Sequence, residues 1–140
     1  MIADNLQQVK KLISQAAEKA GRNPAEIQLV AVSKRFSAEA ISEAYAAGQR
    51  CFGENYVQEL REKRNMVPAE VRFHFIGHLQ TNKAKLAAEN CDMVESVDCL
   101  KLAKALHLHL LENGRQLDIL IQVNVGDDPK KSGVGSSDTA

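Results

Sequence analysis

Hydrophobic residues follow a helical period over roughly the first twenty positions of the chain. The members of the pattern are Leu6, Val9, Leu12, Ile13, Ala16, Ala17 and Ala20. Their spacing of three and four places them on one face of a helix. We therefore expect a helix that is capped at Asp4 or Asn5 and ends at Gly21, before Pro24.

After this helix, a short apolar strand followed by a helix recurs along the chain. The expected strands cover residues 27–34, 50–52, 71–76, 93–97 and 117–125. The expected helices cover residues 38–47, 56–66, 82–90 and 99–113, and their predicted N-caps include Ser37, Thr81 and Asp98. Strict alternation of strands and helices is typical of a parallel sheet with right-handed crossovers.

The even spacing of these units favours a (β/α)8 barrel over a doubly wound sheet. The turn after the first strand, residues 33–36, contains none of the glycines of a dinucleotide-binding turn. A complete barrel needs about 250 residues, whereas this chain has 140. We expect an α/β fold, a partial (β/α)8 TIM barrel of about five βα units after an N-terminal helix, over residues 1–125. Residues 126–140 are expected to form a polar, mobile tail.

Charge and cysteine content narrow the classes of partner. Lysine plus arginine and aspartate plus glutamate balance at 18 each, so no net field attracts nucleic acid or an anionic membrane. No apolar run is long enough for a membrane span, and residues 1–4 do not begin a secretory signal. Cys51, Cys91 and Cys99 are irregularly spaced, which is typical of reduced thiols rather than of disulfides or a metal site. We expect a cytoplasmic protein with a small-molecule partner. The open edges of a partial barrel are consistent with self-association; a different wrapping of the helices and a truncated chain are the alternatives.

Lys34 lies where the first apolar strand meets the following loop. The carboxyl ends of strands form the active-site face of βα folds, and a neutral amine there can react with a carbonyl compound. Burial beside Val30 and Val32 would favour the neutral amine. A lysine at a strand end can equally be a snorkelling residue without chemistry, and this segment alone leaves both interpretations open.

Three further polar residues fall at or near the next strands. Asn55 can hydrogen-bond a ligand or cap the following helix. His74 alternates with Phe73 and Phe75, so it faces the barrel interior if these two rings pack on the helices; a hydrogen-bonded core histidine is the alternative. Glu54 can pair with a cation at the barrel mouth, but we expect a solvated carboxylate in the first turn of the following helix.

Taken together, the loops resemble those of the pyridoxal-phosphate homeostasis proteins, which are similar to a single-domain version of the alanine-racemase barrel. The matching segments, in chain order, are AVSK (31–34), FGENYVQE (52–59), HFIGHLQTNK (74–83), SVD (96–98), QVNV (122–125) and KSG (131–133). They extend over nearly the whole chain, so the resemblance concerns the fold as well as a single loop.

The resemblance implies a barrel of the alanine-racemase type in which Lys34 carries pyridoxal 5'-phosphate as a Schiff base. Asn55 would hydrogen-bond the ring hydroxyl of the cofactor or position Lys34, and His74 would lie beneath the cofactor. The family is linked to vitamin B6 and amino-acid homeostasis without a well-defined turnover reaction. In the family, a Ser/Gly-rich phosphate cradle and an arginine near the pyridine nitrogen come from strands after the Lys-Ser-Gly loop.

Two alternative functions stay open. The first is a fragment or assembly module that does not bind the cofactor by itself. The second is a racemase-like enzyme dependent on pyridoxal phosphate. Racemisation in the related fold needs a tyrosine base from another domain, whereas Tyr45 and Tyr56 of this chain both fall on expected helices.

Overall fold

Parallel strands and helices alternate along the chain in the computed structural model, which describes residues 1–139. The strands of the main sheet are β1 (Ala31–Val32), β2 (Cys51–Glu54), β3 (Arg72–Phe75), β4 (Met93–Val97) and β5 (Asp118–Ile121). The helices after α1 (Ile2–Lys19) are α2 (Ala38–Ala46), α3 (Val57–Arg64), α4 (Ala84–Asn90) and α5 (Leu100–Asn113), with short 3-10 helices η1 (Pro24–Glu26), η2 (Thr81–Lys83) and η3 (Ser136–Asp138). Neighbouring strands pair in parallel in the order β1-β2-β3-β4-β5. The predicted fold, an open part of a (β/α)8 barrel, is confirmed.

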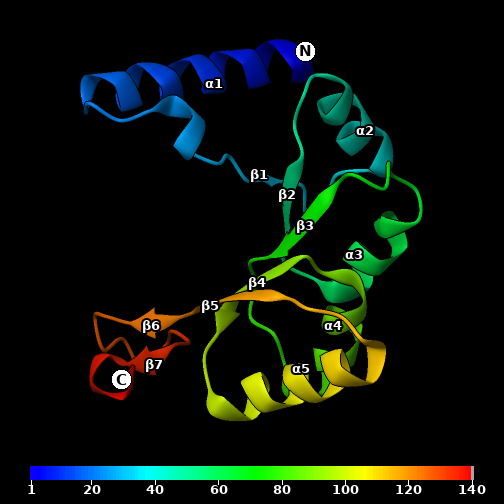
Figure 1. The fold of residues 1–140 in the computed structure, drawn as a ribbon, viewed down its shortest axis with the longest axis vertical. Helices are drawn as coiled ribbons and strands as arrows, with labels where there is room; N and C mark the ends of the chain where they lie inside the picture. Colours follow the sequence, from blue (N-terminus) through cyan, green and yellow to red (C-terminus); the bar gives the residue numbers. More distant parts are fainter. Residues whose placement is uncertain (140) are drawn as a thin grey trace.

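Helix α1 lies across one end of the molecule (Figure 1). It begins after Met1 rather than at the predicted caps, because the Asn5 amide donates to the Met1 carbonyl (3.1 Å) and extends the helix upstream. Asp4 lies instead in the first turn, where the helix dipole favours a carboxylate. Gly21 follows the helix with a φ of +69°, as predicted for its end. Among the helices of residues 1–139, none combines the length and apolar character that a membrane span requires.

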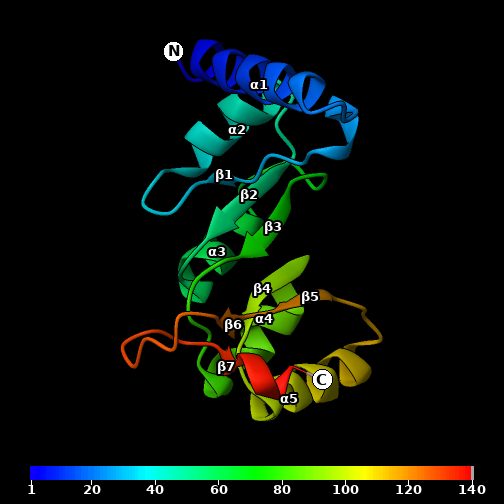
Figure 2. The same ribbon diagram turned by 90° about the vertical axis from the view of Figure 1, so that its left-hand side faces the viewer.

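The helices α2 to α5 cover one side of the curved sheet (Figure 1), and Figure 2 looks toward the molecule from the other side, where the strands follow one another in order. Between sheet and helices lies a core with three large rings, Phe52, Phe73 and Phe75, each at most 2% exposed. Leu60 from α3 and Leu102 from α5 belong to the same cluster. Burial of these rings against the helices fixes which face of each strand points outward.

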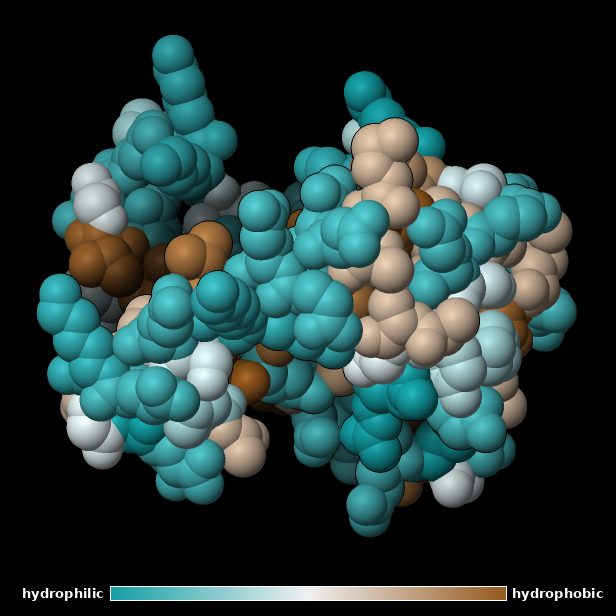
Figure 3. Space-filling model, turned by 90° about the horizontal axis from the view of Figure 1, so that it is seen from above, coloured by the Kyte–Doolittle hydropathy of each residue, from teal (hydrophilic) through white to brown (hydrophobic). Residues whose placement is uncertain are grey.

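The two edge strands leave apolar side chains exposed. On β5, the exposed fractions are 42% for Ile119, 50% for Leu120 and 58% for Ile121. Strands inside a parallel sheet are normally covered on both faces, so β5 is an open edge. Figure 3 shows a mostly hydrophilic surface from above, with hydrophobic side chains gathered in a hollow on its left. The open edges agree with a partial barrel, and self-association through them stays a prediction.

Strand β1 is shorter than the predicted segment 27–34. The ladder between β1 and β2 begins at the pair Ala31 and Phe52, and β2 itself begins at Cys51. The side chain of Gln49 takes the place of a ladder partner, because its Nε2 donates to the Leu29 carbonyl at 2.7 Å. A side-chain hydrogen bond thus replaces the backbone ladder at Leu29.

One of the three predicted helix caps is confirmed. The Ser37 hydroxyl accepts a backbone N–H in the first turn of α2 (3.3 Å). The prediction for Thr81 is wrong, since this residue lies inside η2, which has no side-chain cap. The prediction for Asp98 is also wrong: Cys99 is the N-cap of α5, and an Asp98 carboxylate oxygen lies 3.4 Å from Nδ1 of His78 instead. The Asp98 carboxylate therefore pairs with the His78 imidazole instead of accepting a backbone N–H at the start of α5.

The expected last strand, 117–125, divides into two. After β5, strand β6 (Val123–Asn124) pairs with β7 (Val134–Gly135) in a separate small sheet. The Asn124 side chain donates to the Asp128 carbonyl (2.8 Å) and ties the connecting loop to β6. The polar segment 126–140 thus contains a strand and a 3-10 helix in its described part. Its mobility stays a prediction, and Ala140 lies outside the described residues.

The cysteines differ in their surroundings. Cys99 is exposed, whereas Cys51 and Cys91 are buried. Burial raises the pKa of the Cys51 thiol, and it raises that of Cys91 to about 12. Because the thiolate is the reactive form, we expect Cys99 alone to react quickly with Ellman's reagent in the folded chain, and the other two only after unfolding. Cys99→Ser should remove the fast phase; a fast phase that survives this change would contradict the assignment.

Candidate functional site

Lys34 lies in a tight turn just beyond β1. The Phe36 amide donates to the Ser33 carbonyl (3.1 Å) and closes the turn, and Arg35 adopts a left-handed φ of +64°. The predicted burial of Lys34 is not found: its side chain is exposed, as is that of Val32, whereas Ser33 between them is buried. Among residues 1–139, no carboxylate pairs with the Lys34 ammonium. The amine is therefore accessible.

Strand register brings the three predicted site residues to neighbouring positions. Val32 pairs with Gly53, and Gly53 pairs with His74, so these residues lie side by side across β1, β2 and β3. Lys34 follows Val32 by two residues, and Asn55 follows Gly53 by two. Lys34 lies in the turn after β1 and Asn55 in the bend after β2, just beyond the paired residues. Lys34 and Asn55 thus lie at the carboxyl edge of the sheet, with His74 one pleat below, at the edge where βα folds place their sites.

Asn55 is half-buried and lies against the loop that follows β3. The interpretation of Asn55 as a helix cap is not borne out, because the N-cap of α3 is Tyr56. A Cβ atom on Gly77 would lie 2.6 Å from the Asn55 carbonyl oxygen and 2.9 Å from its Cα. Only a glycine lets the two loops approach this closely, so Gly77 helps to set the position of Asn55.

Gly77→Ala is expected to push the Asn55 backbone away and to lower the free energy of unfolding by about 1–3 kcal/mol. Gly126→Ala is a matched control, since nothing lies within 4 Å of an added Cβ there, and it should change stability by less than about 0.5 kcal/mol. Urea unfolding of both variants measures the difference. Equal stability of the two variants would show that the loops are not in the contact described.

His74 is buried on β3 with a carboxylate partner. Its Nδ1 lies 2.7 Å from Oε1 of Glu95 on β4. Phe73 and Phe75 pack in the core with the helices, which is the condition under which His74 faces the barrel interior. The carboxylate fixes the orientation of the imidazole, and a neutral ring that carries its proton on Nδ1 keeps Nε2 as an acceptor.

A buried ionic cluster beside the Lys34 turn was not predicted. We call Ser33, Glu54, Glu59 and Lys63 the Glu54 cluster. Glu54 is fully buried, and its Oε1 lies 2.7 Å from both Nζ of Lys63 and Oγ of Ser33. Nζ of Lys63 is also 2.6 Å from Oε1 of Glu59. The expectation of a solvated Glu54 is wrong, because Glu54 alternates with Gly53 and points toward the helices, as Phe52 does.

Only part of this cluster has a signal in the sequence. Glu59 and Lys63 are four residues apart on a predicted helix, which is the spacing of an ion pair. That spacing does not reveal burial, since most such pairs are solvated. The contacts of Lys63 with Glu54 and Ser33 depend on how α3 packs on the sheet.

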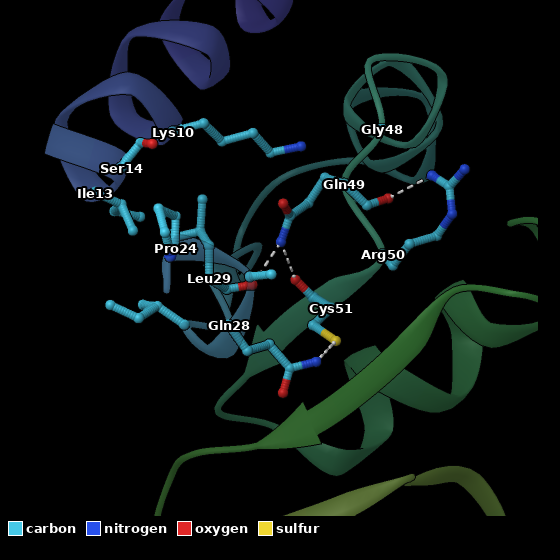
Figure 4. Close-up of a pocket in the computed structure, with 12 residues that line it drawn as sticks. Lys10, Ile13, Ser14, Pro24, Gln28, Leu29, Gly48, Gln49, Arg50 and Cys51 are labelled. Carbon is cyan, nitrogen blue, oxygen red and sulfur yellow. Dashed lines mark hydrogen bonds between the residues drawn. The ribbon is translucent and has the colours of Figure 1, made fainter. Parts of the chain in front are cut away.

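Cavities lie at both edges of the sheet. At the carboxyl edge, a cavity of about 520 Å³ is lined by Asn55, Gly77 and Lys83 among others. At the amino edge, a cavity of about 450 Å³ lies between α1 and the start of β2 (Figure 4), where the Gln28 side chain donates to Sγ of Cys51 (2.7 Å). In βα barrels the amino-terminal face contributes stability and the carboxyl-terminal face carries function, so the cavity beside Asn55 is the better candidate.

Metal chemistry has no candidate in the part of the chain that the structure describes. No group of three or more His, Cys, Asp or Glu side chains there could hold a metal ion.

His78 is exposed and contacts Ser132 (3.2 Å) and Asp98 (3.4 Å) through the same ring nitrogen. These contacts tie the loop after β3 to its neighbours.

Comparison with known proteins gives consistent matches. Residues 2–140 match the family described as alanine racemase, N-terminal domain. The chain is 46% identical over 137 residues to the pyridoxal phosphate homeostasis protein of Escherichia coli (strain K12), which covers 95% of this chain and 58% of that protein. The chain thus spans somewhat more than half the length of this curated relative.

Two solved structures extend the comparison. PipY of Synechococcus elongatus PCC7942, solved with PLP bound, is 38% identical and superposes with a TM-score of 0.78, covering 95% of this chain and 58% of PipY. Histidine racemase from Leuconostoc mesenteroides is 21% identical, with a TM-score of 0.68, over 96% of this chain and 34% of the racemase, a likeness of fold alone. The resemblance to the N-terminal part of the pyridoxal phosphate homeostasis proteins is confirmed, and the chain belongs to the alanine racemase N-terminal domain family.

Proposed function

We propose that this chain holds pyridoxal 5'-phosphate as a Schiff base on Lys34 and takes part in vitamin B6 and amino-acid homeostasis in the cytoplasm. The observation that carries the proposal is the accessible Lys34 amine at the carboxyl edge of β1, beside Asn55 and above His74. The relative PipY, which has been solved with PLP bound, supports the choice of cofactor.

The described residues fit the aldehyde and ring of this cofactor. Pyridoxal phosphate supplies an aldehyde carbon, which forms a C=N bond with a neutral primary amine and releases one water molecule. Lys34 supplies the amine, and none of the ion pairs among residues 1–139 involves it. The cavity beside Asn55 lies at the same edge, although neither Lys34 nor His74 lines it.

Asn55 and His74 would bind the cofactor and orient its ring. The Asn55 side chain has both donors and an acceptor for the ring hydroxyl, and its backbone is held in place by the approach of Gly77. His74 would lie beneath the ring, with its imidazole oriented by Glu95. This role requires binding and release of the cofactor, and no turnover reaction is part of it.

An absorbance titration tests the proposal. Addition of pyridoxal phosphate to the purified chain should produce a visible Schiff-base band that saturates at a stoichiometry of about one per chain, as expected for a single reactive amine. Borohydride should remove the band by reducing the C=N bond. A chain that is folded by circular dichroism and gives no saturable band would contradict the proposal.

A further inference from the structure

We infer that the Glu54 cluster positions the turn that carries Lys34, which makes Glu59 and Lys63 positioning residues for the Schiff base. The inference rests on the proposed role of Lys34 and adds to it the group of residues that holds the amine in place.

The cluster binds the backbone on both sides of Lys34. On the amino side, Nζ of Lys63 donates to the Ser33 carbonyl at 2.8 Å. On the carboxyl side, the Arg35 amide donates to Oε1 of Glu59 at 2.7 Å. Since Glu59 and Lys63 are themselves paired, the residues before and after Lys34 are fixed by one connected group.

The bonding capacity of Lys63 is fully used. An ammonium has three N–H donors, and three oxygen atoms lie within 2.8 Å of Nζ: the Ser33 carbonyl, Oε1 of Glu54 and Oε1 of Glu59. The Lys63 side chain is 8% exposed and that of Glu54 is 0% exposed. The Glu59 side chain is 26% exposed. Hydrogen bonds between charged groups are strong in the dry surroundings of Lys63 and Glu54, so this pair forms a rigid base for the anchor.

The cluster acts through the backbone rather than on the amine. Ser33 points toward Glu54 and the helix layer, as its hydroxyl hydrogen bond shows. Lys34 is the next residue, and its side chain is exposed. The cluster holds the backbone before and after Lys34, and none of its hydrogen bonds or ion pairs among residues 1–139 involves the Lys34 amine.

The conformation of Arg35 indicates why an anchor is needed. Its φ of +64° is disfavoured for any residue with a Cβ atom, and a glycine would be the usual choice. The hydrogen bond from its amide to Glu59 offsets this cost. Burial raises the pKa of the Glu59 carboxyl, but the hydrogen bonds from Lys63 and the Arg35 amide outweigh it and hold this pKa below its ordinary value. Glu59 is therefore a charged acceptor at neutral pH.

Glu59→Ala tests the anchor, with Glu62→Ala as its matched control. Both changes place an alanine in α3, and only Glu59→Ala removes the contacts with Arg35 and Lys63, since Glu62 is exposed. Without cofactor, hydrogen exchange of the Arg35 amide should become roughly 10- to 100-fold faster in Glu59→Ala and stay unchanged in Glu62→Ala. Glu59→Gln keeps an oxygen acceptor and should restore most of the protection.

The same variants test the effect on the amine. If the turn holds its productive conformation for only about a tenth of the time, the apparent Kd for pyridoxal phosphate rises roughly tenfold. We expect this rise in Glu59→Ala and not in Glu62→Ala. Unchanged Arg35 exchange in folded Glu59→Ala, or faster exchange with an unchanged Kd, would overturn the positioning role alone. A wild-type chain that forms no Schiff base would remove the proposed function and the positioning role together.

Discussion

Lys34→Ala should abolish the visible band that pyridoxal phosphate produces and should leave the chain folded. The band requires a primary amine, and Lys34 carries the accessible amine at the carboxyl edge of β1. Because the side chain is exposed and unpaired among residues 1–139, its loss should change the free energy of unfolding by less than about 0.5 kcal/mol. Absorbance titration and urea unfolding on the same sample measure both effects.

Two further variants test whether the band depends on the amine of Lys34 rather than on its positive charge, and whether it depends on Lys34 rather than on any exposed lysine. Lys34→Arg keeps a positive charge but has no neutral amine at neutral pH, so it should also lose the band. Lys101→Ala removes an exposed lysine on α5, far along the chain from the site, and should retain it. A full band in Lys34→Ala would refute the assignment, and an unfolded Lys34→Ala chain would point to a structural role for this lysine.

Lys63→Met should have the largest effect on stability, a loss of about 3–5 kcal/mol. The change keeps most of the side-chain volume but removes the cation that Glu54 faces at 2.7 Å. Glu54 is then a buried carboxylate without a countercharge, and its Oε2 already has no hydrogen-bond partner among residues 1–139. A domain of this size has a total stability of about 5–15 kcal/mol, so the loss would be large in a urea unfolding curve.

Two controls separate the loss of a lysine charge from the burial of an unpaired carboxylate. Lys101→Met replaces an exposed helical lysine and should alter stability by less than about 0.5 kcal/mol. Glu54→Gln combined with Lys63→Met removes both buried charges and should be less destabilising than Lys63→Met alone. If Lys63→Met cost as little as Lys101→Met, the described burial of the ion pair would be wrong.

The order of elements could be predicted from hydrophobic periodicity, because each strand and helix buries one face in a common core. Phe73 and Phe75 illustrate this: their alternation with His74 predicts the two faces of β3, and both rings lie in the core. Element ends were less predictable. Asp98 has the chemistry of a cap, but it faces His78 instead, a contact between segments that no local pattern contains.

In the candidate site, too, some residues could be placed from the sequence and others depend on tertiary packing. Lys34 and Asn55 follow adjacent parallel strands, so topology alone brings them to one edge of the sheet. Burial of Glu54 could not be predicted, because a carboxylate is buried only with a partner, and Lys63 reaches it from another element through tertiary packing. The exposure of Lys34, like that of Val32, likewise depends on which face of β1 the rest of the fold covers.

Mass spectrometry of the borohydride-reduced complex tests the central claim most directly. Reduction converts the Schiff base into a stable secondary amine, so the modified residue survives proteolysis and can be located in the peptide that contains it. We predict one phosphopyridoxyl group per chain, on Lys34. A label that is absent from Lys34, or spread over several lysines in proportion to their exposure, would contradict the proposed role of this residue.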